Sequence, residues 1–225
     1  MDLYLDIETI PTKSNRIRSS IADSIKPPGN MRKAETIAEW EANEKQTAVD
    51  NAIAVTSLDG AYGNICCIGW AIDSQPVKSS YGDDEKKVIS DFIAEINKDL
   101  TYLRHVRPRV VGHNVLGFDI RFIWQRAIVL GIKVPNWFPR DPKPWSNDVF
   151  DTMTAFAGQR GSVSLQKLAD ALGFEGKGDM DGSKVAKTWA SGQHDKVATY
   201  CCDDVELTRQ IHKHMQIAFG ETASF

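Results

Sequence analysis

The sequence predicts an α/β fold, and three observations carry that prediction. Short apolar runs rich in strand-forming residues stand at 3–7, 65–72 and 109–113. Longer segments between and after them repeat apolar residues at helical spacing. The sequence shows neither low-complexity segments nor a repeat of about 20 to 50 residues. Strands mixed with helices in this way are typical of a sheet with helices packed against it.

The first strands predict the antiparallel part of the sheet. Residues 3–7 (LYLDI) and 65–72 (ICCIGWAI) are apolar runs, and 77–81 (VKSSY) can pair with them as a third strand. Between the first two, the pattern changes to a charged, alanine-containing stretch that includes the breaker-rich segment KPPGN. We expect residues 13–60, approximately, to form a helical insertion within the domain.

The middle of the chain predicts a helix, a strand and a second helix. From Asp84 to about Val106 the apolar residues recur at helical spacing, and 109–113 (RVVGH) follows as a short buried strand. The second helix is expected to begin near Gly117 and to continue through FDIRFIWQRAIVLGI. This part of the chain therefore alternates between the two kinds of element.

The C-terminal part predicts a loop, a last strand and further helices. Residues 133–147 contain four prolines and predict a loop, after which 149–153 (VFDTM) is a last strand or the entry to a helix. Residues 164–173 and 193–218 repeat apolar side chains at helical spacing. We expect both of these segments to be helices.

Bulk properties bound the class of protein. The 225 residues are 42% hydrophobic and 25% charged, which is an ordinary globular composition, and we expect one domain over 1–225. The net charge of −3 excludes a polycation drawn to phosphate by its overall field, so any nucleic-acid contact has to be local. The opening MDLYLDIETIP lacks the basic start and apolar core of a secretory signal, and no run reaches bilayer length. We expect a cytoplasmic protein that does not act on membranes.

The cysteines form two adjacent pairs, Cys66-Cys67 and Cys201-Cys202. Structural zinc sites separate their cysteines by two to four residues, and disulfide frameworks spread them between loops. We therefore expect reduced, mostly buried thiols.

Two acids stand at the end of the first strand. Side chains alternate across a strand, so Asp6 and Glu8 project from one face while Ile7 points into the core. Oxygen ligands arranged in this way are half of a site for Mg²⁺ or Mn²⁺. Taken alone, the pair is more typical of an ordinary polar strand end, and other residues have to decide.

A second acid-bearing segment is GHNVLGFD, where a strand ends, the chain turns and a helix begins. Asp119 lies in the first turn of that helix, a position that the helix dipole favours for any acid. Asn114 precedes the helical pattern by several residues, and Gly112 and Gly117 leave room for the close approach of a ligand. A nucleotide or phosphate contact at Asn114 is therefore plausible.

The third segment is YCCDD, within the last predicted helix. Tyr200 and Asp204 are four residues apart and share one helix surface, so that a phenol and a carboxylate can act together. Tyrosine and aspartate one turn apart are also common on ordinary, partly exposed helices.

Together the three segments resemble the DnaQ-like exonuclease superfamily, whose fold is ribonuclease H-like. Its motifs D-x-E, N-x₃-[FY]-D and Y-x₃-D occur here in that order. The chain is similar in particular to predicted 3′-5′ exonucleases related to the proofreading domain of family B DNA polymerases, in DIETIP, GHNVLGFDIRF, DGSKVAKTW and YCCDDVELT. This resemblance covers nearly the whole chain outside the insertion. Tyr200 indicates the tyrosine (DEDDy) subtype, because the base of the histidine subtype would stand where this chain has Thr199.

The resemblance implies a mixed sheet of about five strands flanked by helices, with the insertion after the first strand. It also implies two Mg²⁺ or Mn²⁺ ions, about 3.5 to 4 Å apart. Asp6 would bridge them, Glu8 and Asp204 would help to hold the ion that activates water, and Asp119 would serve the other. Tyr200 would orient the attacking water. This catalytic set is Asp6, Glu8, Asp119, Tyr200 and Asp204.

The resemblance also implies contacts to the substrate. Thr9 and Ile10 match the positions that seat the terminal nucleotide, and Asn114 and Phe118 match those that contact the penultimate one. The expected activity is 3′-5′ hydrolysis of DNA, preferentially single-stranded, which releases nucleoside 5′-monophosphates in repair or replication. An RNA exonuclease with the same acids is an alternative, since contacts to the 2′ hydroxyl decide between the polymers. A nucleic-acid-binding module that has lost activity ranks below both, because all four acids are present.

Other segments have weaker signals. The loop 135–147 interleaves aromatic and basic residues that could stack bases, although a packed surface loop is the more ordinary interpretation. We expect Asp151 to serve local hydrogen bonding, and the histidines to have structural or solvent roles. Three lysines of residues 176–189 could contact substrate or simply be solvated: Lys177, Lys184 and Lys187.

Overall fold

The computed structural model describes residues 1–102, 107–175, 178 and 180–220. The chain divides into two compact units. The first consists of Met1–Glu8 and Ile65–Phe225, and the second is Thr9–Asn64. In the described part of the chain, no helix is both long enough and apolar enough to cross a membrane.

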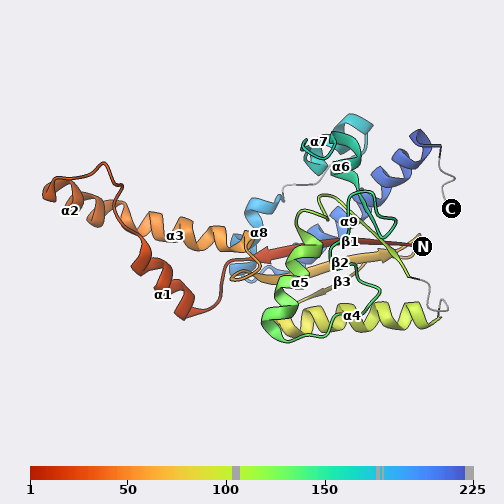
Figure 1. Ribbon diagram of the computed structural model, residues 1–225, viewed down its shortest axis with the longest axis horizontal. Helices are drawn as coiled ribbons and strands as arrows, with labels where there is room; N and C mark the ends of the chain where they lie inside the picture. Colours follow the sequence, from red (N-terminus) through yellow and green to blue (C-terminus); the bar gives the residue numbers. More distant parts are fainter. Residues whose placement is uncertain (103–106, 176–177, 179, 221–225) are drawn as a thin grey trace. The chain divides into compact units, whose positions relative to one another are not determined.

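The first unit is built on a mixed sheet (Figure 1). Within the described residues it has five strands in the order β3-β2-β1-β4-β5. Strand β1 pairs with β4 in parallel, β4 pairs with β5 in parallel, and β2 pairs with β3 antiparallel. The strands are β1 (Asp2–Ile10), β2 (Asn64–Ile72), β3 (Lys78–Tyr81), β4 (Arg109–Gly112) and β5 (Val149–Asp151). The ribonuclease H-like mixed sheet of five strands flanked by helices is confirmed.

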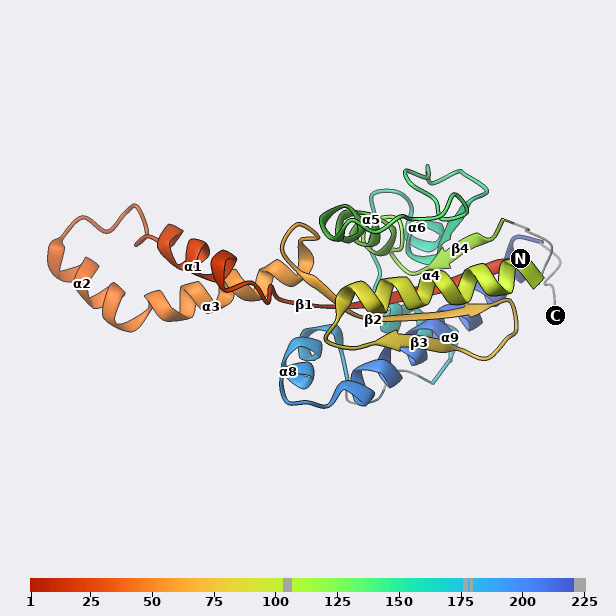
Figure 2. The same cartoon turned by 90° about the horizontal axis from the view of Figure 1, so that it is seen from below.

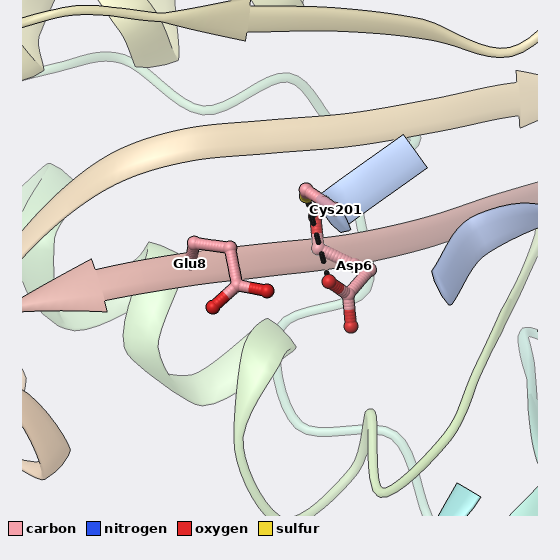
Figure 3. A group of neighbouring side chains, drawn as sticks. All are labelled: Asp6, Glu8 and Cys201. Carbon is pink, nitrogen blue, oxygen red and sulfur yellow. Dashed lines mark hydrogen bonds between the residues drawn. The ribbon is translucent and has the colours of Figure 1, made fainter. Parts of the chain in front are cut away.

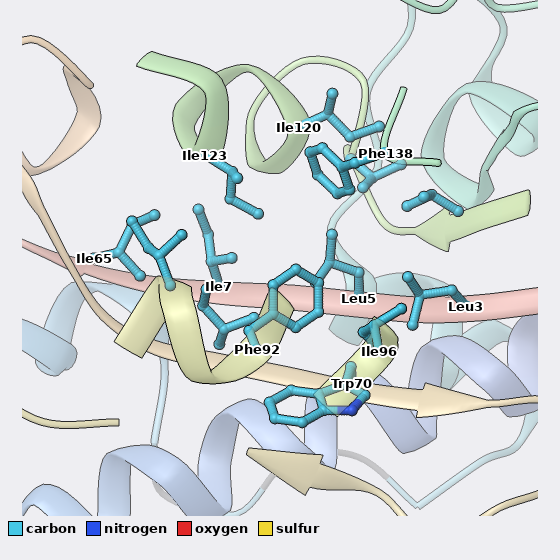
Figure 4. Close-up of a cluster of buried hydrophobic side chains, with 14 of the residues drawn as sticks. Leu3, Leu5, Ile7, Ile65, Trp70, Phe92, Ile96, Ile120, Ile123 and Phe138 are labelled. Carbon is cyan, nitrogen blue, oxygen red and sulfur yellow. The ribbon is translucent and has the colours of Figure 1, made fainter. Parts of the chain in front are cut away.

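Strand β1 has a different character on each face. Leu3, Leu5 and Ile7 are at most 5% exposed and belong to the main hydrophobic core. Helices α4 (Glu85–Tyr102) and α5 (Asp119–Leu130) supply the other side of that core, with Phe92 and Ile123 among its members (Figure 4). The alternate residues Asp2, Tyr4, Asp6 and Glu8 therefore lie on the opposite face.

Helix α9 (His194–Ala218) lines that second face of the sheet (Figure 2). Val205 of α9 is buried in one cluster with Tyr4 of β1 and Val111 of β4. Because an α-helix rises 1.5 Å per residue, the 25 residues of α9 extend for about 37 Å, long enough to follow the whole strand. Helix α7 (Leu165–Leu172) packs on α9 through a smaller apolar cluster.

A buried ion pair joins the two helices on the core side. Arg126 of α5 donates from Nε and Nη2 to the two carboxylate oxygens of Glu85 in α4, both at 2.8 Å. The first of these oxygens also accepts the backbone N–H of Ile65. Since both side chains are at most 7% exposed, removing one partner would leave a buried charge.

Most predicted boundaries lie within a few residues of those observed. The predicted end of the first long helix, near Val106, falls at 103–106, outside the described residues. The segment 149–153 is both a strand and a helix entry, since β5 runs directly into α6 (Thr152–Ala157). The sequence predicted the entry to α6 but not its extent, and it did not predict the short helices η2 (Gly182–Lys184) and α8 (Val185–Ala190). Helices of three to six residues are too short to show an apolar period.

The second unit is mainly helical and contains the predicted insertion. Its helices are α1 (Asn15–Ser24), α2 (Ala34–Asn43), α3 (Lys45–Val55) and η1 (Thr56–Leu58). The Ser14 side chain caps α1 by accepting from the backbone N–H of Ile17. Helix α3 packs on both other α-helices of the unit. That the whole chain 1–225 acts as one exonuclease domain stays a prediction.

Candidate metal centre and active site

Two carboxylates of β1 lie together, as the alternation of the strand requires. Asp6 is half-buried and Glu8 is 8% exposed. One ligand atom from each, together with the sulfur of Cys201, lies within a group spanning no more than 4.8 Å (Figure 3). The predicted common face of the two acids is confirmed, and Ile7 between them points into the core.

Asp119 brings a third carboxylate against the same strand. It is the first residue of α5, and its Oδ1 accepts the backbone N–H of Ile7 at 3.0 Å. Burial raises the pKa of this carboxyl to about 7, and the charges of Asp151 and Asp204 add to that rise. Hydrogen bonds from the backbone N–H groups of Asp119 and Ile7 oppose it. Asp119 therefore lies within electrostatic reach of two further acids.

Tyr200 and Asp204 lie one turn apart on α9, and their side chains are hydrogen-bonded. Both residues are buried, at 7% and 5% exposed. Burial raises the pKa of the Tyr200 phenol well above its ordinary value, and the charges of Asp204, Glu8 and Asp6 raise it further. The phenol is therefore neutral at working pH and has an O–H to donate. The predicted shared helix surface of the two residues is confirmed.

Cys201 is a member of this group that the sequence did not reveal. Its thiol donates to the backbone oxygen of Asp6 at 3.5 Å and to Asp6 Oδ2 at 3.4 Å. The sulfur fits above Gly69 of β2, where an added Cβ would meet it at 2.9 Å. The sequence predicted only that the cysteines are reduced and mostly buried. All four thiols are free, and three of them are buried.

The loop between β4 and α5 is held by Asp151 at the end of β5. The Asp151 carboxylate accepts the backbone N–H groups of Asn114 and Leu116, at 3.1 and 3.0 Å. It also caps α6 by accepting from Met153 and Thr154. The expected role of Asp151 in local hydrogen bonding is confirmed.

The predicted use of two glycines in this loop is wrong. A Cβ on Gly112 would meet the Cβ of Val115 at 2.6 Å, and one on Gly117 would collide with the side-chain oxygen of Asn114. The free space at both positions is therefore taken by the loop itself rather than left for a ligand. Asn114 has φ +61°, a left-handed conformation that asparagine tolerates better than most residues.

The four expected substrate contacts have ordinary structural partners. Phe118 packs on the main core and against the Phe122 ring, with centroids 5.2 Å apart. Thr9 and Ile10 belong to the second unit, where the Thr9 hydroxyl donates to the backbone oxygen of Ser57 and Ile10 is 4% exposed. Contact of these residues, or of Asn114, with nucleotides stays a prediction.

The weaker signals separate into structural and exposed residues. His113 contacts the Thr152 hydroxyl and the Val163 carbonyl at 2.9 and 2.8 Å, which is the expected structural role. Lys184 is ion-paired with Asp181 at 3.0 Å, whereas Lys187 is exposed. Of the lysines and histidines considered in the sequence, Lys177 and His105 lie outside the described residues.

The donor set fits a hard divalent cation. Such ions prefer carboxylate oxygens. Here the charge of Asp204 on α9 raises the pKa of Asp119 on α5, and the charges of Asp6 and Glu8 on β1 raise the pKa of Tyr200. Burial raises the pKa of the Cys201 thiol well above its ordinary value, and its contact with Cys67 adds to this. A neutral thiol donates a hydrogen bond and is a poor metal ligand. The acids are thus the residues suited to hold the ion.

A mixed five-stranded sheet with acids on its central strand is a ribonuclease H-like arrangement. The chain belongs to the family of predicted 3′-5′ exonucleases related to the exonuclease domain of PolB, whose model matches residues 64–223. It is therefore an enzyme of the 3′-5′ exonuclease class. The matched range contains Asp119, Tyr200 and Asp204, while Asp6 and Glu8 precede it.

Among solved structures, the chain is similar to the family B DNA polymerase from the hyperthermophilic archaeon Pyrobaculum calidifontis. The match has 16% sequence identity and a TM-score of 0.58, and it covers 97% of this chain. It covers only 24% of the polymerase. This likeness shows a shared fold over a part of that larger protein. No curated protein matches this sequence.

Proposed function

We propose that this protein removes nucleotides from the 3′ end of single-stranded DNA, with Mg²⁺ or Mn²⁺ held by Asp6, Glu8, Asp119 and Asp204. The observation that supports this most directly is the convergence of acids from three elements distant in sequence. Asp6 and Glu8 come from β1, Asp119 bonds to the backbone between them, and Asp204 acts electrostatically on Asp119. Clustered acids of this kind are stabilised by divalent cations.

The proposed cofactor is a pair of ions, as in other enzymes that displace an oxygen at phosphorus. Such a pair, when bound, lowers the pKa of water and stabilises the leaving 3′ oxygen. The chain's own contribution is to hold ligands and substrate in a fixed arrangement, which is a large part of catalysis in phosphoryl transfer. The products would be nucleoside 5′-monophosphates, and the biological setting would be DNA repair or replication.

Three residues complete the arrangement without being ligands. Tyr200 keeps its proton and bonds to Asp204, so it orients the attacking water through its phenolic oxygen rather than acting as a base. Cys201 fixes the rotamer of Asp6 through its S–H contact. Asp151 fixes the loop that carries Asn114, so that this side chain meets the substrate from a rigid backbone.

The test is digestion of 5′-labelled single strands of DNA and RNA of one sequence, with Mg²⁺, Mn²⁺ or EDTA. We expect a ladder shortening from the 3′ end with either metal, faster on DNA, and none with EDTA. Faster digestion of RNA would favour the RNA exonuclease alternative. Internal cuts, shortening from the 5′ end, or activity in EDTA would contradict the proposal.

A matched pair of variants on α9 tests the ligand assignment. Asp204→Asn should abolish digestion, because a buried proposed ligand is lost, whereas Asp203→Asn next to it changes an exposed acid and should retain digestion. Circular dichroism of both variants controls for folding. Undiminished digestion by Asp204→Asn would remove that residue from the site.

A further inference from the structure

The loop that precedes β5 presents a basic and aromatic surface beside α5. Its first part is internal: Phe138 is 3% exposed, and the Trp137 indole N–H donates to Asn97 at 2.7 Å. Its second part turns outward, and Trp145 is 76% exposed. Sequence alone did not separate these two halves.

A hollow of about 340 Å³ lies between α5 and the outward part of this loop. Apolar side chains including Trp124 form its wall on α5, and cations stand around it. These cations are Arg121, Arg140 and Lys143.

The charge of this hollow is positive. Asp141 is the acid among its lining residues, and its pKa is lowered by the hydrogen bond and charge of Lys143 and then by the charges of Arg121 and Arg140. Lys143 contacts Asp141 at 2.9 Å, while the two arginines act on it less strongly. Three cations around one acid give a local surface suited to phosphate, on a chain whose net charge is −3.

A second hollow, of about 260 Å³, lies on the other side of Pro144 in sequence. Both are lined by Pro144, and the second adds Trp145 and Phe150. An exposed tryptophan next to cations is the combination by which proteins bind single strands, because a base stacks on the ring while phosphates meet the cations.

Both hollows are lined by residues of the segments that carry or support the candidate active site. The first is lined by Leu116 and Ile120, which lie on either side of Asp119 in sequence. The second includes Asp151, which bonds to the backbone of Asn114. A strand whose 3′ end lies at the acids would therefore have this surface within reach of its preceding nucleotides.

We propose that these two hollows form a binding site for single-stranded nucleic acid upstream of the cleaved 3′ nucleotide. Arg121, Arg140 and Lys143 contact phosphates, and Trp145 stacks on a base. The inference rests on the proposed function, since the site acts on the strand that the acids cut. The occupant is a single strand rather than a duplex, in which the base faces are already stacked.

The test measures binding in EDTA, where no cleavage is expected, by fluorescence anisotropy of labelled oligothymidylates of about 4 and about 16 nucleotides. Trp145→Ala should weaken binding of the longer strand by about fivefold or more, and Trp145→Phe, which keeps a stacking ring, should restore most of it. Arg140→Ala should lower the salt dependence of log K by about 0.7 for that strand. Lys86→Ala, an exposed cation on α4, should change neither quantity.

The strand length and form provide the decisive contrast. The losses should be smaller for the shorter strand and smaller still for a blunt duplex. Equal affinity of wild type, Trp145→Ala and Arg140→Ala for the longer strand would overturn the inference. A changed sedimentation of free Trp145→Ala with unaltered strand binding would overturn it as well, and would assign the surface to self-association.

Failure of this inference is distinguishable from failure of the proposed function. If the wild type digests 3′ ends but the variants bind like it, the acids act and the upstream site is wrong. If the wild type binds strands through Trp145 but digests none with either metal, the proposed function is wrong.

Discussion

Two groups of polar residues on one face of β1 differ in the residues that surround their carboxylates. At the start of the strand, Asp2 receives Nε and Nη2 of Arg109 at 2.8 and 3.1 Å. Toward its end, Asp6 and Glu8 lie beside further acids, and the charges that raise the pKa of Tyr200 all belong to carboxylates. The first group, the balanced network, pairs a carboxylate with a guanidinium, whereas the second, the acidic cluster, brings several carboxylates together.

Helix α9 reaches both groups, which makes the contrast sharper. His212 is fully buried beside Asp2, and Arg109 donates to its Nε2 at 3.3 Å. Arginine can only donate, so the single proton of the neutral imidazole is on Nδ1 and is donated to the Tyr4 hydroxyl at 3.0 Å. One helix and one strand thus carry a balanced network at one end and an acidic cluster at the other. The balanced end should serve stability and the acidic end should serve catalysis.

The same substitution at the two ends gives the largest expected difference. Asp6→Asn should reduce 3′-end digestion by at least about a thousandfold, because stabilisation by bound metal is worth several kcal/mol. Its free energy of unfolding in EDTA should fall by less than that of Asp2→Asn, because Asp6 is half-buried and lies beside other carboxylates. The measurements are digestion rates and urea unfolding. A large loss of stability together with normal digestion would reverse the assignment of this end.

Asp2→Asn should do the opposite. It leaves Arg109 and His212 without the partly buried carboxylate that they face, so the free energy of unfolding should fall by about 1 to 3 kcal/mol. Digestion by the folded fraction should equal that of the wild type, because Asp2 is four residues from Asp6 along the strand. Urea unfolding and initial rates measured at low temperature check this. Normal stability of this variant would show that the network is not needed for the fold.

The balanced network should also make stability depend on pH. Burial lowers the pKa of His212 from 6.5 to about 4, with the charge of Arg109 also lowering it and that of Asp2 opposing. The unfolded chain therefore binds a proton that the folded chain rejects between these two values. The contribution of His212 to stability is complete above pH 6.5 and is lost as the pH falls toward 4.

His212→Gln should flatten this dependence. Urea unfolding of wild type and variant at about pH 7 and about pH 5 isolates the histidine from other groups that titrate in the range. The wild type should lose more stability than the variant between the two conditions. Equal losses would mean that His212 titrates alike in the folded and unfolded chain.

Cys201 should give the smallest effect at the acidic end. Cys201→Ala removes a weak donor to Asp6, and digestion should fall by about tenfold or less. Cys201→Ser retains a donor and should recover most of that loss. Cys202→Ala, at the neighbouring half-buried thiol, is the matched control and should digest normally. Equal rates for all three would leave the Cys201 contact without a catalytic role.

Sequence predicted the elements and the acids because both have local signals. Apolar runs and helical spacing locate β1, β2, α5 and α9, and the motif residues Asp6, Asp119 and Asp204 are recognised by their spacing and order. The alternation of a strand is enough to put Asp6 and Glu8 on one face.

The remainder depends on packing between distant segments. The balanced network forms only because β4 pairs with β1 and α9 covers that face, which brings together Asp2, Arg109 and His212. No spacing along the chain predicts this contact. Cys201 reaches Asp6 only because Gly69 leaves room for its sulfur. Likewise, the role of Gly112 depends on where Val115 folds back, which is why the prediction of a ligand space there was wrong.

The most direct test of the acidic end is metal binding without nucleic acid. Free Mn²⁺ can be titrated by electron paramagnetic resonance in the presence of wild type, Asp6→Asn and Asp2→Asn. We predict saturable binding by wild type and Asp2→Asn, and strongly weakened binding by Asp6→Asn. Equal binding by all three proteins would contradict the claim that the acids at the end of β1 form the metal centre.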